Sequence, residues 1–373
     1  MGQLIRENNP YTNLTTVYSY DKGGNITSAK EYAYTTAAEL GAVKKTNTYT
    51  YEDIHWKDKL TSYNGEAITY DEIGNPLTYR DSLSFTWKNG RQLASLQNGS
   101  SVINYTYNAD GVRIGKSGSR AGTFIVSGTQ ILREINSVAT IDYLYDENGS
   151  PIGLTYKGKT YYYRKNLQGD IINITDSTGA KVVTYTYNAW GKIMSMTGNM
   201  ELAVNNPFRY RGYYYDVESG LYYLNSRYYD PQTGRFINAD APEILDGGND
   251  HLLENNLFAY CFNDPVNNSD PNGYFALALA GFGAANFWNP IGWVALGVSA
   301  VATAGVIAYG IYEMSKGGKQ RIRDTGYLGI PDQEINRRYN DPKTPKAERQ
   351  RLKKEQKARR SRNMQKRGGN NRK

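Results

Sequence analysis

Histidine and cysteine are nearly absent from this chain of 373 residues, which has two histidines and one cysteine. Disulfide frameworks need paired cysteines, and zinc fingers and Ser-His-Asp triads need histidine. Both histidines, His55 and His251, precede Phe275, so such sites are excluded from the C-terminal part. We expect neither a metal nor a cofactor, and we expect Cys261 to pack in a strand as a small apolar residue.

The beginning of the chain also lacks a long apolar stretch. Met1 is followed by Gly-Gln-Leu-Ile-Arg, which is not the hydrophobic region of a signal peptide. The first aromatic repeat begins at about Val17, and the few hairpins that follow would leave strand edges unpaired. We therefore expect a C-terminal piece of a longer shell.

Tyrosine and glycine, by contrast, are abundant, with 34 and 38 residues. They recur in units of the form aromatic-x-aromatic-Asp/Asn-x-x-Gly, at residues 18–24, 69–74, 105–111, 143–149 and 185–191. Each unit predicts a strand, a turn in which glycine takes a positive φ, and a second strand. We therefore expect a mainly β fold in which residues 17–240 form curved antiparallel hairpins with tyrosines in rows and no helix longer than about two turns.

The densest tyrosine run is FRYRGYYYDVESGLYYLNSRYYDPQTGRFINAD, residues 208–240. Alternating tyrosines between D-x-x-S-G and D-P-x-T-G turns predict consecutive hairpins of half-buried strands. The run resembles the core of Rhs/YD-repeat proteins, which include wall-associated proteins and the C subunits of Tc toxins, and the resemblance is close over residues 210–273. It implies a β-hairpin shell, here a partial cocoon, that delivers a toxin encoded at the C-terminus.

Four regions are expected on this basis. They are a repeat shell (residues 1–207), an Rhs repeat-associated core (208–274), an apolar helical segment (275–312) and a small basic α-helical toxin-like domain (313–373).

The resemblance also implies an intramolecular aspartyl protease. Its residues fall in R-Y-Y-D-P, in the aspartate after G-R-F and in the last D-P-x-G, which places them at Arg227, Asp240 and Asp270, with cleavage between Tyr274 and Phe275. Two adjacent carboxylates can act as base and acid on a water molecule, and an arginine can fix their charge and geometry.

Structural alternatives stay open for the same residues. Asp270-Pro-Asn-Gly is also an ordinary turn, and Arg227 could pair with a shell carboxylate. The family usually has Asp-Pro after G-R-F and an apolar residue after D-P-x-G, where this chain has Asp240-Ala and Tyr274. Asp264 is a reserve candidate that lies further from the bond.

Charge and hydropathy change sharply after the core. Residues 314–373 carry 20 Lys/Arg and 6 Asp/Glu, a net charge of +14, whereas residues 1–313 carry a net charge of −6. Between them, residues 275–312 contain no Asp, Glu, Lys or Arg. This segment could insert transiently in a membrane, plug the inside of the shell or form a buried linker helix.

The basic tail predicts two polar helices that need a partner surface. Arg359, Arg360 and Arg362 could hold phosphates, so a toxin that damages RNA or DNA is one interpretation. A membrane-acting toxin and a purely binding tail are others. Enzyme activity, in the core or in the tail, stays an open question.

The resemblance further implies partners and a location. The partners would be an acidic immunity protein, the upstream shell and a secretion apparatus, and the protein would be secreted or associated with the cell surface or cell wall. The alternative is an adhesive β-repeat protein without toxicity, but an adhesin gives no reason for the abrupt change of composition after Gly273.

Overall fold

A computed structural model describes residues 2–118, 120–240, 256–271, 273 and 277–278. These residues all belong to the first of two units of the chain, Met1–Asn289. The fold is mainly β, as predicted, and the described residues contain a single α-helix, α1 (Met200–Asn205). The predictions for residues 279–373, including the basic helices, concern residues outside the described part of the chain.

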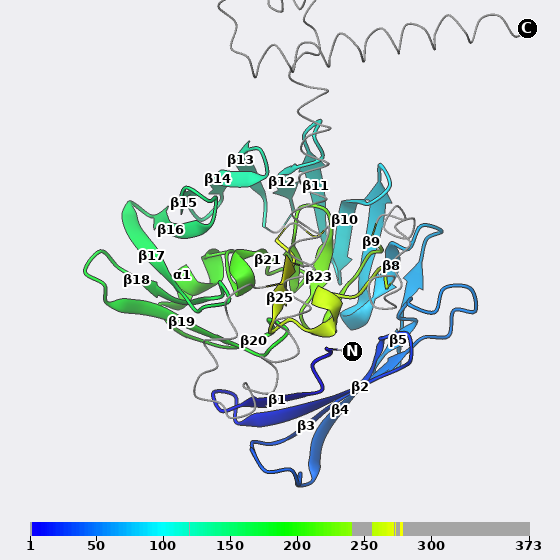
Figure 1. Cartoon of the computed structure of the whole chain (residues 1–373). Helices are drawn as coiled ribbons and strands as arrows, with labels where there is room; N and C mark the ends of the chain where they lie inside the picture. Colours follow the sequence, from blue (N-terminus) through cyan, green and yellow to red (C-terminus); the bar gives the residue numbers. More distant parts are fainter. Residues whose placement is uncertain (1, 119, 241–255, 272, 274–276, 279–373) are drawn as a thin grey trace, which may run out of the picture. The chain divides into compact units, whose positions relative to one another are not determined.

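Two antiparallel sheets make up the repeat region, one of six strands and one of fourteen. Within each sheet, neighbouring strands are consecutive in the chain, so the strands in Figure 1 follow one another in sequence order. The first sheet contains β1 (Arg6–Asn9), β2 (Leu14–Tyr20), β3 (Ile26–Ala33), β4 (Val43–Thr50), β5 (Ser62–Tyr63) and β6 (Glu66–Ala67). The second contains β7 (Thr69–Tyr70), β8 (Pro76–Tyr79), β9 (Leu83–Lys88), β10 (Gln92–Asn98), β11 (Ser101–Tyr107), β12 (Arg113–Ser117), β13 (Gly122–Ser127), β14 (Gln130–Asn136), β15 (Thr140–Tyr145), β16 (Pro151–Tyr156), β17 (Lys159–Lys165), β18 (Ile171–Thr175), β19 (Lys181–Tyr187) and β20 (Ile193–Gly198).

The predicted turn chemistry is confirmed in the repeats. In the unit around Asp71, the carboxylate accepts the Asn75 N–H at 2.8 Å, and the Asp71 carbonyl accepts the Gly74 N–H at 3.2 Å. Gly74 has a φ of 83°, a conformation that is strained for residues with a Cβ. The motif therefore reverses the chain through interactions within five residues.

The tyrosine that precedes each turn also bonds to an earlier part of the chain. Its hydroxyl donates to a main-chain carbonyl, which satisfies both polar groups inside the sheet packing. The pairs are Tyr20 with Leu4, Tyr70 with Leu60, Tyr107 with Leu93, Tyr145 with Ile131 and Tyr187 with Ile171, at 2.6–3.1 Å. Hydrogen bonds as well as ring packing thus hold the tyrosine side chains of each row in position.

Residues 208–240 form the predicted hairpins. Their four-stranded antiparallel sheet comprises β21 (Tyr214–Asp216), β22 (Leu221–Tyr223), β23 (Tyr228–Asp230) and β24 (Arg235–Phe236). The expectation of half-buried strands is wrong here, because every residue of β22, β23 and β24 is buried. Both faces of these strands are covered, since they pack against the repeat strands as well as against their own neighbours.

Buried polar contacts join the core to distant repeats. Asp230 pairs with Arg80 at 2.7 Å and Asp216 pairs with Arg113 at 2.6 Å. Contacts also link the first and the last repeats: the carboxylate of Glu7 accepts the Ala189 N–H at 2.8 Å. The two ion pairs therefore anchor the core to the turn that follows β8 and to β12.

Strand pairing already begins at β1, which starts at Arg6, ahead of the first aromatic repeat at Val17. Two local expectations need correction. Cys261 is buried, but it begins the short 3-10 turn η4 (Cys261–Asn263) with a φ of 51°, so it does not lie in a strand. Of the predicted apolar helix, Leu277–Ala278 is strand β26, which pairs with β25 (Asn268–Ser269). Within the described part of the chain, no helix has the length and apolar character to span a membrane.

Candidate active site

The structure brings Arg227, Asp240 and Asp270 together. The Arg227 Nη2 atom lies 2.8 Å from Asp240 Oδ2 and 3.2 Å from Asp270 Oδ2. All three residues are buried, with exposed fractions of 4%, 6% and 1%. Because both carboxylates contact the same nitrogen atom, Nη2, they lie close to each other at one end of the guanidinium group.

The arginine is fixed by contacts on its other sides. Its guanidinium carbon lies 3.6 Å from the centre of the Phe236 ring, a cation–π contact, and Nη1 donates to the Leu257 carbonyl at 3.2 Å. Burial lowers the pKa of Arg227, and the carboxylates of Asp240 and Asp270 oppose that change. The side chain remains a cation at neutral pH, because an arginine in a protein keeps its proton.

The main chain of Asp240 is held by the segment at Leu257 and by a repeat turn at Arg91. Its N–H donates to the Leu257 carbonyl at 2.9 Å, and its carbonyl accepts Arg91 Nη2 at 2.8 Å. Arg91 precedes β10. A cavity of about 370 Å³, lined in part by Arg91, Tyr228 and Asp240, adjoins this side of the site.

Asp270 begins a tight turn that ends at Gly273. Its Oδ1 atom accepts the Gly273 N–H at 2.8 Å, as the turn interpretation predicts, and Arg227 Nε donates to the Gly273 carbonyl. Gly273 has a φ of 78°, and a Cβ there would lie 2.6 Å from Ser226 Oγ. The last glycine of D-P-x-G is therefore required both by its conformation and by the close packing.

The two residues of the predicted cleavage site, Tyr274 and Phe275, lie outside the described residues. Strands β25 and β26 precede and follow them in the chain and pair with each other, Ser269 with Leu277 and Asn268 with Ala278. Ser269 directly precedes Asp270, so this pairing adjoins one of the two aspartates.

The other candidates have different surroundings. The two carboxylate oxygens of Asp264 accept hydrogen bonds from Asn267 at 3.2 and 2.8 Å, within a turn of its own. Among the described residues, no cluster of three or more His, Cys, Asp or Glu side chains could hold a metal ion. Arg359, Arg360 and Arg362 lie outside the described residues.

Sequence reasoning did not select Arg91, Arg211 or Tyr213, which contact the segments that carry the two aspartates. Arg211 and Tyr213 belong to R-Y-R-G-Y-Y-Y-D, where a charged residue interrupts a tyrosine run. A buried cation among aromatic residues needs partners, and that rule is the signal that could have identified Arg211. Arg91 follows an ordinary Asn-Gly turn and carries no comparable signal.

Tyrosine-rich repeat hairpins that enclose a core sheet define an Rhs/YD-repeat shell protein. The Teneurin YD-shell family profile matches residues 1–266, and the chain belongs to this family. Its polymorphic-toxin relatives include tRNA nuclease WapA of Bacillus subtilis (strain 168), which is 31% identical over 346 residues covering 88% of this chain and 14% of WapA. Because 88% of this chain is more than 266 residues, the alignment with WapA extends beyond the part matched by the family profile.

One further relative and one solved structure are similar to this chain. Double-stranded DNA deaminase toxin A of Burkholderia cenocepacia (strain H111) is 26% identical over 321 residues, covering 73% of this chain and 22% of the toxin. The crystal structure of TcdB2-TccC3-Cdc42 is similar in fold, with a TM-score of 0.54 and 21% identity over 70% of this chain and 13% of that chain. The chain thus spans only a small part of each of these relatives.

Proposed function

We propose that this chain is the C-terminal part of a polymorphic toxin that cuts itself between Tyr274 and Phe275 and so frees its C-terminal segment. The observation that carries the proposal is the contact of Arg227 with Asp240, Asp270 and the Gly273 carbonyl. A buried arginine between two carboxylates, next to the carbonyl that precedes Tyr274, is an arrangement suited to hydrolysis of that neighbouring bond.

The proposed reaction is hydrolysis by water. One carboxylate removes a proton from the water, whose oxygen bonds to the Tyr274 carbonyl carbon. The other aspartate starts as the protonated carboxylic acid and gives its proton to the Phe275 nitrogen as the C–N bond breaks. Arg227 offsets part of the negative charge of the paired aspartates, and the cavity beside Asp240 has ample volume for a water molecule.

The purified wild-type chain provides the direct test. We expect intact-mass measurement to find fragments of residues 1–274 and 275–373, and N-terminal sequencing of the smaller one to begin at Phe275. The longer parent protein should be cut at the same bond. A chain and a parent that both stay whole would overturn the proposal.

The four regions expected from the sequence are part of this proposal. Residues 1–207 act as shell, 208–274 as the cutting core, and 275–312 and 313–373 as the released effector. The net charge of +14 in residues 314–373 supports a nucleic-acid target, as does the similarity to a tRNA nuclease and a DNA deaminase toxin. An acidic immunity protein and export with the upstream shell follow for such a toxin, and transient membrane insertion through residues 275–312 is the alternative mode of action.

We expect the released fragment, residues 275–373, to bind RNA at low salt and to lose affinity steeply as salt rises. Replacing Arg359, Arg360 and Arg362 by alanine should reduce the log–log salt slope by about 2 to 3, since each lost phosphate contact removes about one released counterion. A matched variant that loses Lys316, Lys319 and Arg321 has the same net charge and should change the slope less. If the fragment neither binds RNA or DNA nor arrests growth, but depolarises membranes, the membrane-acting alternative replaces this proposal.

A further inference from the structure

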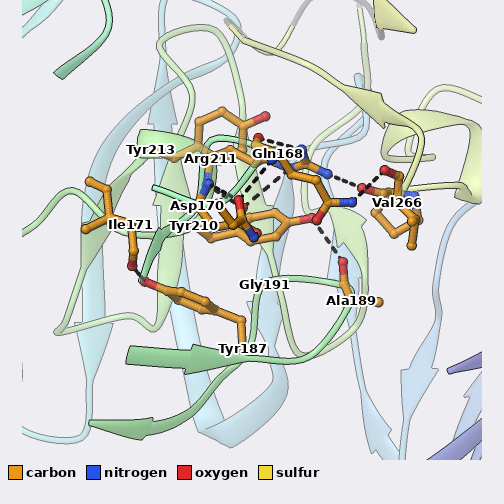
Figure 2. Close-up of polar contacts among 12 residues, drawn as sticks. Gln168, Asp170, Ile171, Tyr187, Ala189, Gly191, Tyr210, Arg211, Tyr213 and Val266 are labelled. Carbon is orange, nitrogen blue, oxygen red and sulfur yellow. Dashed lines mark hydrogen bonds and ion pairs between the residues drawn. The ribbon is translucent and has the colours of Figure 1, made fainter. Parts of the chain in front are cut away.

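The segment that carries Asp270 is held by side chains from two other parts of the chain (Figure 2). Gln168, in the turn between β17 and β18, donates to the Val266 carbonyl at 2.6 Å. Arg211, in the short 3-10 turn η2 (Tyr210–Gly212), donates to the carbonyls of Pro265 and Asn268. Three of the four residues before Ser269 are thus restrained from outside their own turn.

Arg211 is itself held in place by the same repeat turn. Its main-chain N–H donates to Asp170 Oδ1 at 3.0 Å, its Nη1 donates to the Gln168 carbonyl at 2.6 Å, and its Nε lies 3.6 Å from Asp170 Oδ1. Burial raises the pKa of Asp170, and the charge of Arg211 opposes that change. Both side chains are almost fully buried, so this pair is a rigid support.

Tyr213 contacts Asp270 directly. Its hydroxyl donates to the Asp270 carbonyl at 2.8 Å and accepts the Asp270 N–H at 3.3 Å, and it lies 3.1 Å from the Tyr260 hydroxyl. Burial raises the pKa of Tyr213 well above its ordinary value, so the phenol keeps the proton that it donates. One hydroxyl therefore holds both main-chain polar groups of Asp270.

We propose that Tyr213, supported by the Arg211–Asp170 pair, is a positioning residue for self-cleavage. With its main chain fixed on both sides, Asp270 has only its two side-chain torsions free, and its carboxylate is directed to Arg227. Tyr213 bonds to the main chain of Asp270 rather than to its carboxylate, so it acts through Asp270 and not on the reacting bond. This inference rests on the proposed self-cleavage.

The Tyr213→Phe variant removes this hydroxyl and keeps the ring. We expect self-cleavage to become about tenfold slower, because small displacements of a reacting group are costly. Tyr222→Phe is the matched control, since Tyr222 is also buried, its ring contacts the Tyr213 ring, and its hydroxyl donates to the Gly191 carbonyl at 3.0 Å. The Tyr222→Phe variant should lose about as much unfolding free energy as Tyr213→Phe, but it should cut itself at the wild-type rate. Equal slowing in both variants would mean that Tyr213 is merely structural and would overturn the proposal.

A second measurement separates this inference from the proposed function. Amide hydrogen exchange of residues 264–273 is followed in full-length Asp240→Asn protein, with and without Tyr213→Phe or Tyr222→Phe. We expect Tyr213→Phe alone to raise exchange in this segment at least about fivefold. Unchanged exchange overturns the positioning role whether or not the wild type cuts itself, and faster exchange with an unchanged cleavage rate overturns it as well. An uncut wild type with faster exchange would reject the proposed self-cleavage, and with it Tyr213's role in that reaction, while leaving the contact with Asp270 demonstrated.

Discussion

The Asp240→Asn and Asp270→Asn variants are each expected to cut themselves at least about a hundredfold more slowly than the wild type, so that they are still whole when the wild type has been cut. Each change keeps the size of the side chain but removes one of the two groups that must accept or donate a proton, and loss of general acid–base catalysis typically costs this much or more. Intact-mass measurement over time, at equal protein concentration, gives the rates.

Asp264→Asn is the matched control for these variants. Asp264 lies six residues before Asp270 and is also an aspartate in a turn, but its carboxylate is bonded to Asn267. We expect it to be cut at close to the wild-type rate. Circular dichroism should show that all three variants are folded. Cleavage of Asp240→Asn or Asp270→Asn at the wild-type rate would refute their assigned roles, and a block in Asp264→Asn alone would transfer the role to the reserve candidate.

The Arg113→Ala variant is expected to lose about 3–5 kcal/mol of unfolding free energy. Arg113 is completely buried, and its Nη1 and Nη2 atoms bond to Asp216 at 2.6 and 3.1 Å. Its guanidinium also lies 4.2 Å from the centre of the Tyr223 ring. Removing the arginine leaves a buried carboxylate with Lys116 as its remaining cationic partner, at 3.3 Å, and leaves a cavity between the repeat strands and the core.

Arg133→Ala is the appropriate comparison, because Arg133 also pairs with an aspartate, Asp142, but the two side chains are 46% and 38% exposed. An exposed ion pair adds little to stability, so we expect the Arg133→Ala change to leave the unfolding free energy almost unchanged. Urea denaturation followed by tryptophan fluorescence measures both variants, in the uncut Asp240→Asn background. Equal effects of the two changes would show that Arg113 does not anchor the core.

Local structure followed closely from the sequence. The Asp/Asn-x-x-Gly motif predicted turns such as that of Asp71 and Gly74, because the bonds that form them lie within five residues. The period of the tyrosines predicted antiparallel hairpins, and the D-P-x-G motif predicted the turn from Asp270 to Gly273. For Arg227, Asp240 and Asp270, residue chemistry alone left a structural role open, and the resemblance to a family selected them.

Only the tertiary structure decided which residues meet. Gly179 and Gly191 close the same kind of turn with φ values of 87° and 82°, yet a Cβ at Gly179 has nothing within 4 Å, whereas one at Gly191 would lie 2.4 Å from the Tyr210 ring. Likewise, the sequence places Asp240 and Asp270 thirty residues apart, and their contact with Arg227 depends on where the repeat turns at Arg91 and Gln168 hold each segment. The sequence determined the turns because their interactions are short-range, and the structure decided the site because that site depends on the accumulated geometry of some twenty paired strands.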